Sequence, residues 1–160
     1  MNYLPVALMF SLGLHSLNVH ASEQEVHFLG MLIEAPPCVI NENKMIKVNF
    51  GSDIMTTRID GVNYKKPIDF GLDCSQAASN SQKLRIRGDT ALFDNSVLYG
   101  NKTGLGIAIY NGSVKLPIDQ WVNFTMPNVP SLSAVLVKQN GITLSGGPFS
   151  VLASLVVDYQ

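Results

Sequence analysis

Apolar and polar residues alternate with a period of two in five short stretches of the chain, and these stretches are rich in β-branched and aromatic side chains. Glycine-containing turn signals, such as Asp60-Gly61, Asn111-Gly112 and Asn140-Gly141, lie between them. A sustained helical stripe is missing from every window of a dozen residues. The pattern predicts an all-β domain, an antiparallel sandwich of the immunoglobulin type. The five stretches are residues 46–50, 68–72, 84–87, 107–110 and 122–126.

The last predicted strand, residues 149–159, carries an uninterrupted apolar and aromatic face and is followed by a single residue, Gln160. A complete sandwich of this type would continue into one more strand, which would cover that face and pair with that edge. We therefore expect an incomplete sandwich that lacks its final strand. The face consists of Phe149, Val151, Ala153, Leu155, Val157 and Tyr159.

A second unusual segment precedes the first cysteine. Val26, Phe28, Gly30 and Leu32 alternate with other residues, and Pro36-Pro37 then interrupts any regular strand. The chain thus has an apolar strand with no evident place in its own sheet, and a sheet with a strand missing. Strand addition between molecules, in which each copy lends this segment to a neighbour, would resolve both.

The N-terminus has the features of a secretory signal peptide. Residues 4–14 form an apolar run of eleven, which is shorter than the roughly 20 residues of a membrane-spanning helix. Val19 and Ala21 occupy the −3 and −1 positions of a cleavage site. No Lys or Arg precedes the run, so an uncleaved anchor is the alternative. We predict a signal peptide at 1–21, an N-terminal donor-strand extension at 22–35 and one domain at 36–160.

The predicted export decides how the two cysteines, Cys38 and Cys74, are interpreted. In an oxidising compartment a single pair of cysteines predicts a disulfide. Closing a loop of about 37 residues would stabilise the fold by roughly 3.8 kcal/mol in the loop-entropy description. A metal pair or a reactive thiol is the alternative, but His27 is the only histidine after residue 21 and offers no ligand set.

Composition and residue inventory exclude several classes of function. The chain is 46% hydrophobic and 14% charged, with a formal net charge of -1, which argues against disorder and against nucleic-acid binding. His27 alone cannot build a Ser-His or Cys-His catalytic pair or a zinc site. We therefore expect no enzyme activity, no cofactor or metal, and no small-molecule substrate.

Several motifs together resemble those of the minor subunits of chaperone–usher pili, in the class of the adaptor subunits of P and type 1 pili. The resemblance covers nearly all of the chain after the signal peptide. A glycine fourteenth from the C-terminus, an alternating last strand and a penultimate tyrosine form its most specific part. The matching features are residues 26–30, Pro37-Cys38, Cys74, residues 104–110, Gly147 and Tyr159.

The resemblance implies a mechanism of assembly. A two-domain periplasmic chaperone would insert one of its strands beside the C-terminal strand, and its basic residues would hold the terminal carboxylate of Gln160. At the outer-membrane usher, the N-terminal extension of the next subunit would displace the chaperone strand. Neighbouring pilin subunits, and a tip adhesin, would be further partners in a cell-surface fimbrium. The donor residues would be Val26, Phe28, Gly30 and Leu32, and the acceptor groove would run from Gly147 along the apolar face of residues 149–159.

Two alternatives remain open at this point. Within a pilus, the sequence does not separate an adaptor from a minor shaft subunit. Outside that class, the chain could be a self-contained secreted immunoglobulin-like binding module. In that interpretation Trp121 could form a carbohydrate platform, although a single Trp in an all-β domain more often packs in the core or at its rim.

Overall fold

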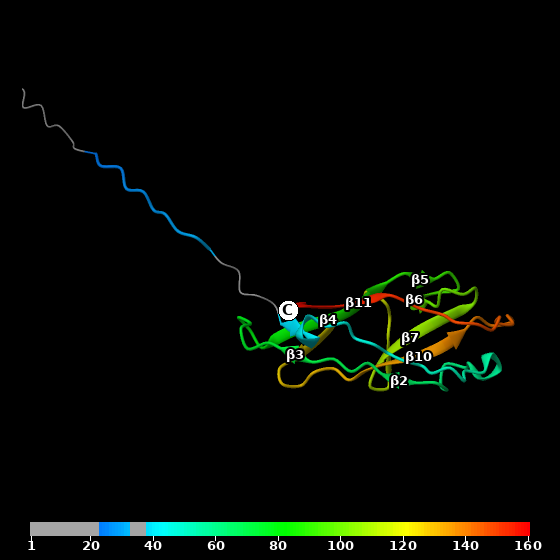
Figure 1. The fold of residues 1–160 in the computed structure, drawn as a ribbon. Coiled ribbons are helices and arrows are strands. Elements are labelled where there is room, and N and C mark those ends of the chain that lie inside the picture. The colour runs from blue at the N-terminus through cyan, green and yellow to red at the C-terminus, as the bar shows by residue number, and fades with distance from the viewer. Residues whose placement is uncertain (1–22, 33–37) are drawn as a thin grey trace, which may run out of the picture. The chain divides into compact units, whose positions relative to one another are not determined.

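A computed structural model of the chain describes residues 23–32, an N-terminal segment, and residues 38–160, a domain. The predicted signal peptide, the last residues of the predicted extension and the Pro36-Pro37 pair lie outside the described residues. In Figure 1 the described domain consists mainly of strands and connecting loops, with two short 3-10 turns. Within the described parts, no helix combines the length and apolar character needed to cross a bilayer.

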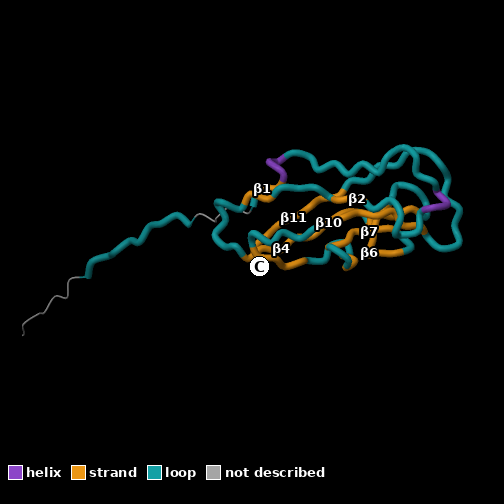
Figure 2. Tube along the Cα trace, turned by 90° about the horizontal axis from the view of Figure 1, so that it is seen from below, coloured by secondary structure: helices purple, strands orange, loops and turns teal. Residues whose placement is uncertain are grey.

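The strands of the domain form a six-stranded sheet, a three-stranded sheet and a two-stranded sheet, and every pair is antiparallel (Figures 1 and 2). The six-stranded sheet has the order β2 (Lys66–Pro67), β10 (Leu132–Lys138), β7 (Leu105–Asn111), β6 (Asp94–Tyr99) and β5 (Thr90–Ala91), with β8 (Val114–Leu116) also paired to β7. The three-stranded sheet has the order β11 (Ala153–Tyr159), β4 (Ser81–Gly88) and β9 (Val122–Thr125). β1 (Val39–Ile40) pairs with β3 (Leu72–Asp73), and single 3-10 turns occur at Asn41–Asn43 and Thr56–Arg58.

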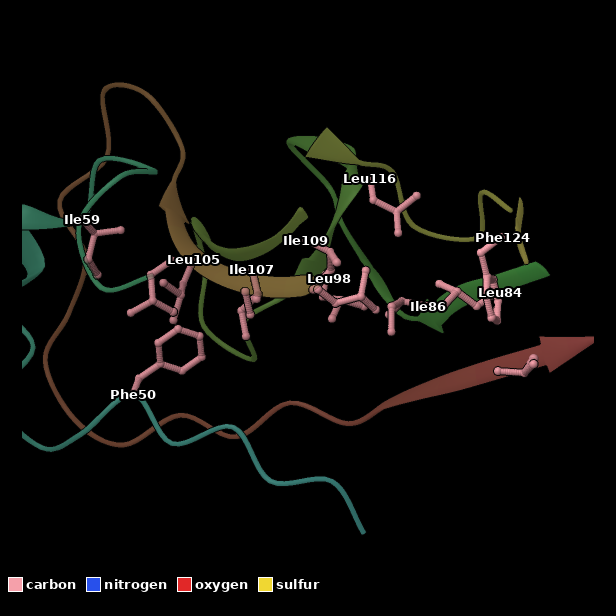
Figure 3. Packing of buried hydrophobic residues seen from close by; sticks show 14 of the residues in the cluster. Phe50, Ile59, Leu84, Ile86, Leu98, Leu105, Ile107, Ile109, Leu116 and Phe124 are labelled. Carbon is pink, nitrogen blue, oxygen red and sulfur yellow. The ribbon is translucent and has the colours of Figure 1, made fainter. Parts of the chain in front are cut away.

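The main core lies between the two larger sheets. Alternate residues of β4, such as Leu84 and Ile86, are buried and meet Leu98, Ile107 and other residues of the six-stranded sheet (Figure 3). This is the packing of a β-sandwich, in which the inner faces of two sheets supply the core. The predicted all-β, immunoglobulin-like fold class is confirmed.

The six-stranded sheet is also apolar on its second face. Val97, Ala108 and Val135 form a separate buried cluster there, with Phe93 packed against it. At Gly106 a β-carbon would come within 3.1 Å of the Phe93 ring, so the glycine permits this close approach. β7 and β10 are consequently covered on both faces.

The strand predictions are confirmed at three of the five stretches. Residues 84–87 lie in β4, 107–110 in β7 and 122–125 in β9. The prediction is wrong at residues 46–50, which form no strand, and at 68–72, where strand begins only at Leu72. The last strand also begins at Ala153 rather than at residue 149. Residues 68–72 make only isolated backbone hydrogen bonds, from the Ile68 N–H to the Leu132 carbonyl and from the Asn41 N–H to the Gly71 carbonyl, and these do not extend into a ladder.

Candidate functional site

The C-terminal strand β11 lies at one edge of its sheet. It pairs along its whole length with β4, from Ala153 opposite Gly88 to Tyr159 opposite Gln82. The sheet order β11-β4-β9 leaves the other edge of β11 without a partner strand in the described part of the chain. The sandwich therefore lacks a final strand beside β11, as predicted. An open edge of this length presents a row of N–H and C=O groups to a further strand.

The apolar face of β11 is only partly covered. Val157 belongs to the core and is 8% exposed, whereas Phe149, Val151 and Leu155 are half-buried and contact the core from one side. Ala153 is exposed. Phe149 and Val151 are half-buried and alternate with exposed residues before β11 begins, although they are not paired in a strand. An additional strand at this edge would complete the cover of these side chains.

A cavity of about 570 Å³ lies at the beginning of this face. Val48 and Phe50 line one part of it, and Gly147 and Phe149 line another. The rings of Phe50 and Phe149 lie 6.0 Å apart between centroids. In Figure 3 Phe50 lies close to Leu105, next to the chain that leads into β11. The face beside β11 thus ends in a cavity whose walls are partly apolar, with polar residues such as Asn49, Thr56 and Lys102 also in the lining.

The predicted signature glycine, Gly147, lies in the wall of this cavity. Its φ of +108° is in a region that side chains other than glycine rarely adopt. Lys102 crosses over the same segment, because its Nζ donates a hydrogen bond of 3.1 Å to the Gly146 carbonyl. A β-carbon at Gly147 would lie 3.4 Å from that nitrogen. The backbone conformation therefore favours glycine here, whereas the Lys102 side chain could shift to admit a β-carbon.

The last two residues are held to the sheet by several hydrogen bonds. The side-chain amide of Gln160 donates to the carbonyls of Gln82 at 2.8 Å and Phe124 at 2.9 Å, thereby bridging β11 to both other strands. The Gln160 N–H also donates to the Ser81 carbonyl at 3.4 Å. The Tyr159 hydroxyl accepts a bond of 3.0 Å from the Ala78 N–H. The terminal residue is consequently fixed in place at the end of the sheet.

The predicted donor segment forms no strand in residues 23–32. Phe28 is 93% exposed, and Val26 and Leu32 are also exposed. Nothing lies within 4 Å of a β-carbon built at Gly30. The His27 Nε2 and a Glu25 carboxylate oxygen lie 3.7 Å apart, at positions of the opposite parity. Taken by itself, the segment presents large apolar side chains that a partner could bury.

The two cysteines form the predicted disulfide, Cys38–Cys74. It joins the first described residue of the domain to the residue that follows β3. Across the described residues, there is no cluster of three or more His, Cys, Asp or Glu side chains that could hold a metal ion.

Trp121 packs against two cations on the outer face of the three-stranded sheet. The Arg85 guanidinium lies 4.3 Å and the Lys83 ammonium 5.1 Å from a ring centroid of Trp121. Arg85 also forms an ion pair of 2.9 Å with Asp119. The indole thus takes part in cation–π contacts within the protein itself.

Two contributors to the groove were missed by the sequence analysis. Residues 46–50 were predicted as a strand, but their alternation gave no indication that Val48 and Phe50 would line the end of the groove. Lys102 was not singled out, because its contact with Gly146 spans 44 residues and leaves no local signal.

Comparisons with known proteins agree with this geometry. The profile of the family described as "Fimbrial protein" matches residues 26–160. The fimbrial-like protein YfcR of Escherichia coli (strain K12), itself described as uncharacterized, is 34% identical over 152 residues, which cover 91% of this chain and 87% of YfcR. YfcQ of the same organism is 30% identical over 147 residues, which cover 88% of this chain and 90% of YfcQ.

Two solved structures share the fold. The P pilus adaptor subunit PapF is 26% identical, with a TM-score of 0.59, and the match covers 79% of this chain and 98% of PapF. The P pilus rod subunit PapA is 23% identical, with a TM-score of 0.65, and the match covers 78% of this chain and 100% of PapA.

Proposed function

The chain belongs to the fimbrial protein family as a subunit of the chaperone–usher type, a structural class and not an enzymatic one, and from this premise we propose that it polymerises by exchanging β-strands. The observation that carries the proposal is the open edge of β11 with its half-buried inner face. In the subunit as exported, a periplasmic chaperone fills this groove. In the fibre, the N-terminal extension of the next subunit fills it, which is residues 23–32 where that subunit is another copy of this chain.

The predicted donor residues match the groove in kind and in spacing. A strand that completes an immunoglobulin-like sheet runs antiparallel to its neighbour. The C-terminal end of the donor, with Leu32, therefore lies at the cavity by Phe149, and the N-terminal end lies toward Tyr159. Val26 and Phe28 then face β11, near the half-buried Leu155 and the exposed Ala153. Gly30 brings the backbone close where the face is shallow.

The energies involved explain why such a subunit needs a partner. Burying Val26, Phe28 and Leu32 contributes about 1.5–3 kcal/mol for each side chain, or roughly 5–9 kcal/mol together. The stability of an entire domain is typically about 5–15 kcal/mol. A domain without the strand is therefore marginally stable, with an edge prone to aggregation. A dedicated chaperone that supplies the strand during export removes that problem.

We further assign the chain as a minor subunit, an adaptor near the tip next to the adhesin. The similarity to PapF, an adaptor subunit of the P pilus, supports this assignment. The fixed position of Gln160 supports its role as the residue whose terminal carboxylate the chaperone holds. Export through the periplasm, passage through the outer-membrane usher and location in the surface fimbrium complete the proposal. We propose residues 1–21 as the signal peptide, 22–35 as the donor extension and 36–160 as the pilin domain.

Co-expression of residues 22–160 with and without the periplasmic chaperone tests strand exchange. We expect a soluble 1:1 complex, which loses its chaperone when a synthetic peptide of residues 23–32 is added. Leu155→Asp should abolish both associations, because it places a charge on the inner face of β11. Ser154→Asp is the matched control on the outer face and should keep both. A monomer that melts cooperatively without the chaperone and ignores the peptide would refute the proposal.

A further inference from the structure

An exposed leucine lies directly before β11, on the face of the sheet opposite the groove. Leu152 is 83% exposed. It has the same parity as Ser154 and Asp158, which are also exposed, and as Val156, which is half-buried; of its two chain neighbours, Val151 is half-buried and Ala153 is exposed. A single exposed leucine is common on protein surfaces and needs no explanation by itself. The donor segment, however, supplies a second observation.

The donor segment is apolar on both of its faces in its second half. When Phe28, Gly30 and Leu32 face the groove, the residues between them must face the other side of the sheet, because side chains alternate along a strand. Those residues are Leu29 and Met31, which are 96% and 87% exposed. Burial in the groove does not account for them.

The register that best matches side-chain sizes brings these exposed residues together. In an antiparallel pairing, Phe28 fits opposite the small Ala153, and Gly30 fits opposite Val151. Leu32 then lies opposite Phe149 at the cavity. The same register sets Leu29 opposite Leu152, with Met31 on the diagonal. Directly opposite side chains have β-carbons about 4.5–5.5 Å apart, and diagonal ones remain within reach of long side chains.

We propose that Leu152 is a second contact point for the donor strand of another copy of this chain, on the outer face of the sheet, where it pairs with Leu29 and Met31. The proposal rests on strand exchange as the function and adds a recognition element to it. The groove then contacts the side chains on one face of the donor strand, and Leu152 contacts those on the other face. Donor strands with polar residues at these two positions would bind less well to this subunit.

A double-mutant cycle between subunit and peptide tests the pairing. The subunit carries Leu152→Thr and the peptide of residues 23–32 carries Leu29→Thr, since threonine keeps the strand propensity. In the wild-type subunit we expect Leu29→Thr to weaken the peptide by about two- to fivefold, the size of a cross-strand pair. In the Leu152→Thr subunit the same peptide change should have little further effect. Val114→Thr, at another exposed position in β8, is the control and should leave the peptide effect unchanged.

The outcomes separate this inference from the proposed function. If the wild-type peptide displaces the chaperone but the Leu29 and Leu152 effects are additive, the pairing is wrong and strand exchange stands. If Leu152→Thr lowers self-association of peptide-filled subunits without changing peptide affinity, Leu152 contacts a lateral neighbour instead, and the pairing is again wrong. If the wild-type peptide does not bind at all, strand exchange itself fails.

Discussion

Replacing Phe28 by alanine in the donor peptide probes the alternation of inward and outward residues most directly. The side chain is 93% exposed in the free segment, so nearly all of its surface would be newly buried in a groove. Burial of a phenylalanine stabilises by about 1.5–3 kcal/mol, and truncation inside a packed site costs about 3–5 kcal/mol. The groove is open on one side and can partly relax, so we expect a loss of about 2–4 kcal/mol, which is about 30- to 700-fold in the dissociation constant.

The assay is displacement of the chaperone from the purified complex, followed by anisotropy of a labelled peptide of residues 23–32. His27→Ala is the control, because His27 neighbours Phe28 but has the opposite parity, and it should change affinity by less than about threefold. A shift of one residue in register would exchange the two faces. If His27→Ala weakens the peptide as much as Phe28→Ala does, or if Phe28→Ala has no effect, the assignment of donor residues is wrong.

Three further predictions concern the donor, the disulfide and one carboxylate. Gly30→Leu should permit chaperone binding to the variant's own groove but impair its donation to a neighbour, and normal polymerisation in an in vitro assembly assay would contradict this. Replacing both cysteines, Cys38→Ser with Cys74→Ser, should lower the unfolding free energy of the peptide-filled subunit by roughly 3.8 kcal/mol in urea titrations; an unchanged midpoint would show that the bridge adds nothing. Hydrogen bonds from the Ser96 side chain and N–H, together with Lys115, lower the pKa of Asp94 from 3.8 to about 2. The stabilisation from Asp94 is therefore complete above pH 4 and is lost as the pH falls toward 2, so Asp94→Asn should flatten the dependence of unfolding free energy on pH in that window.

The fold class could be predicted because apolar and polar residues alternate along a strand that has one buried and one exposed face. Residues 84–87 and 122–125 have one face in the core and one in solvent, and both were found. β10 was missed for the opposite reason. Its apolar run from Ala134 to Val137 has cover on both faces, so it does not alternate. Continuous apolar runs of this kind cannot be assigned to strand from periodicity alone.

The strand predicted at residues 46–50 shows what sequence can and cannot supply. Ile46, Val48 and Phe50 are more buried than the residues between them, as the alternation requires. Strand pairing is missing because the described chain offers no neighbour at that position. The sequence thus predicted the alternating burial of these side chains correctly, but it did not show that strand pairing would be missing.

The Cys38–Cys74 bridge has a mechanical consequence. In a fibre of the proposed kind, tension reaches each subunit through its donor strand and enters the domain at Cys38. The two-stranded sheet that follows contains only two residue pairs, Val39 with Asp73 and Ile40 with Leu72, and would peel apart under modest load. The disulfide carries the load covalently past this weak point. A force along the axis of the donor strand then loads all the hydrogen bonds at the β11 edge in shear at the same time. A hydrogen-bonded ladder resists shear better than it resists peeling.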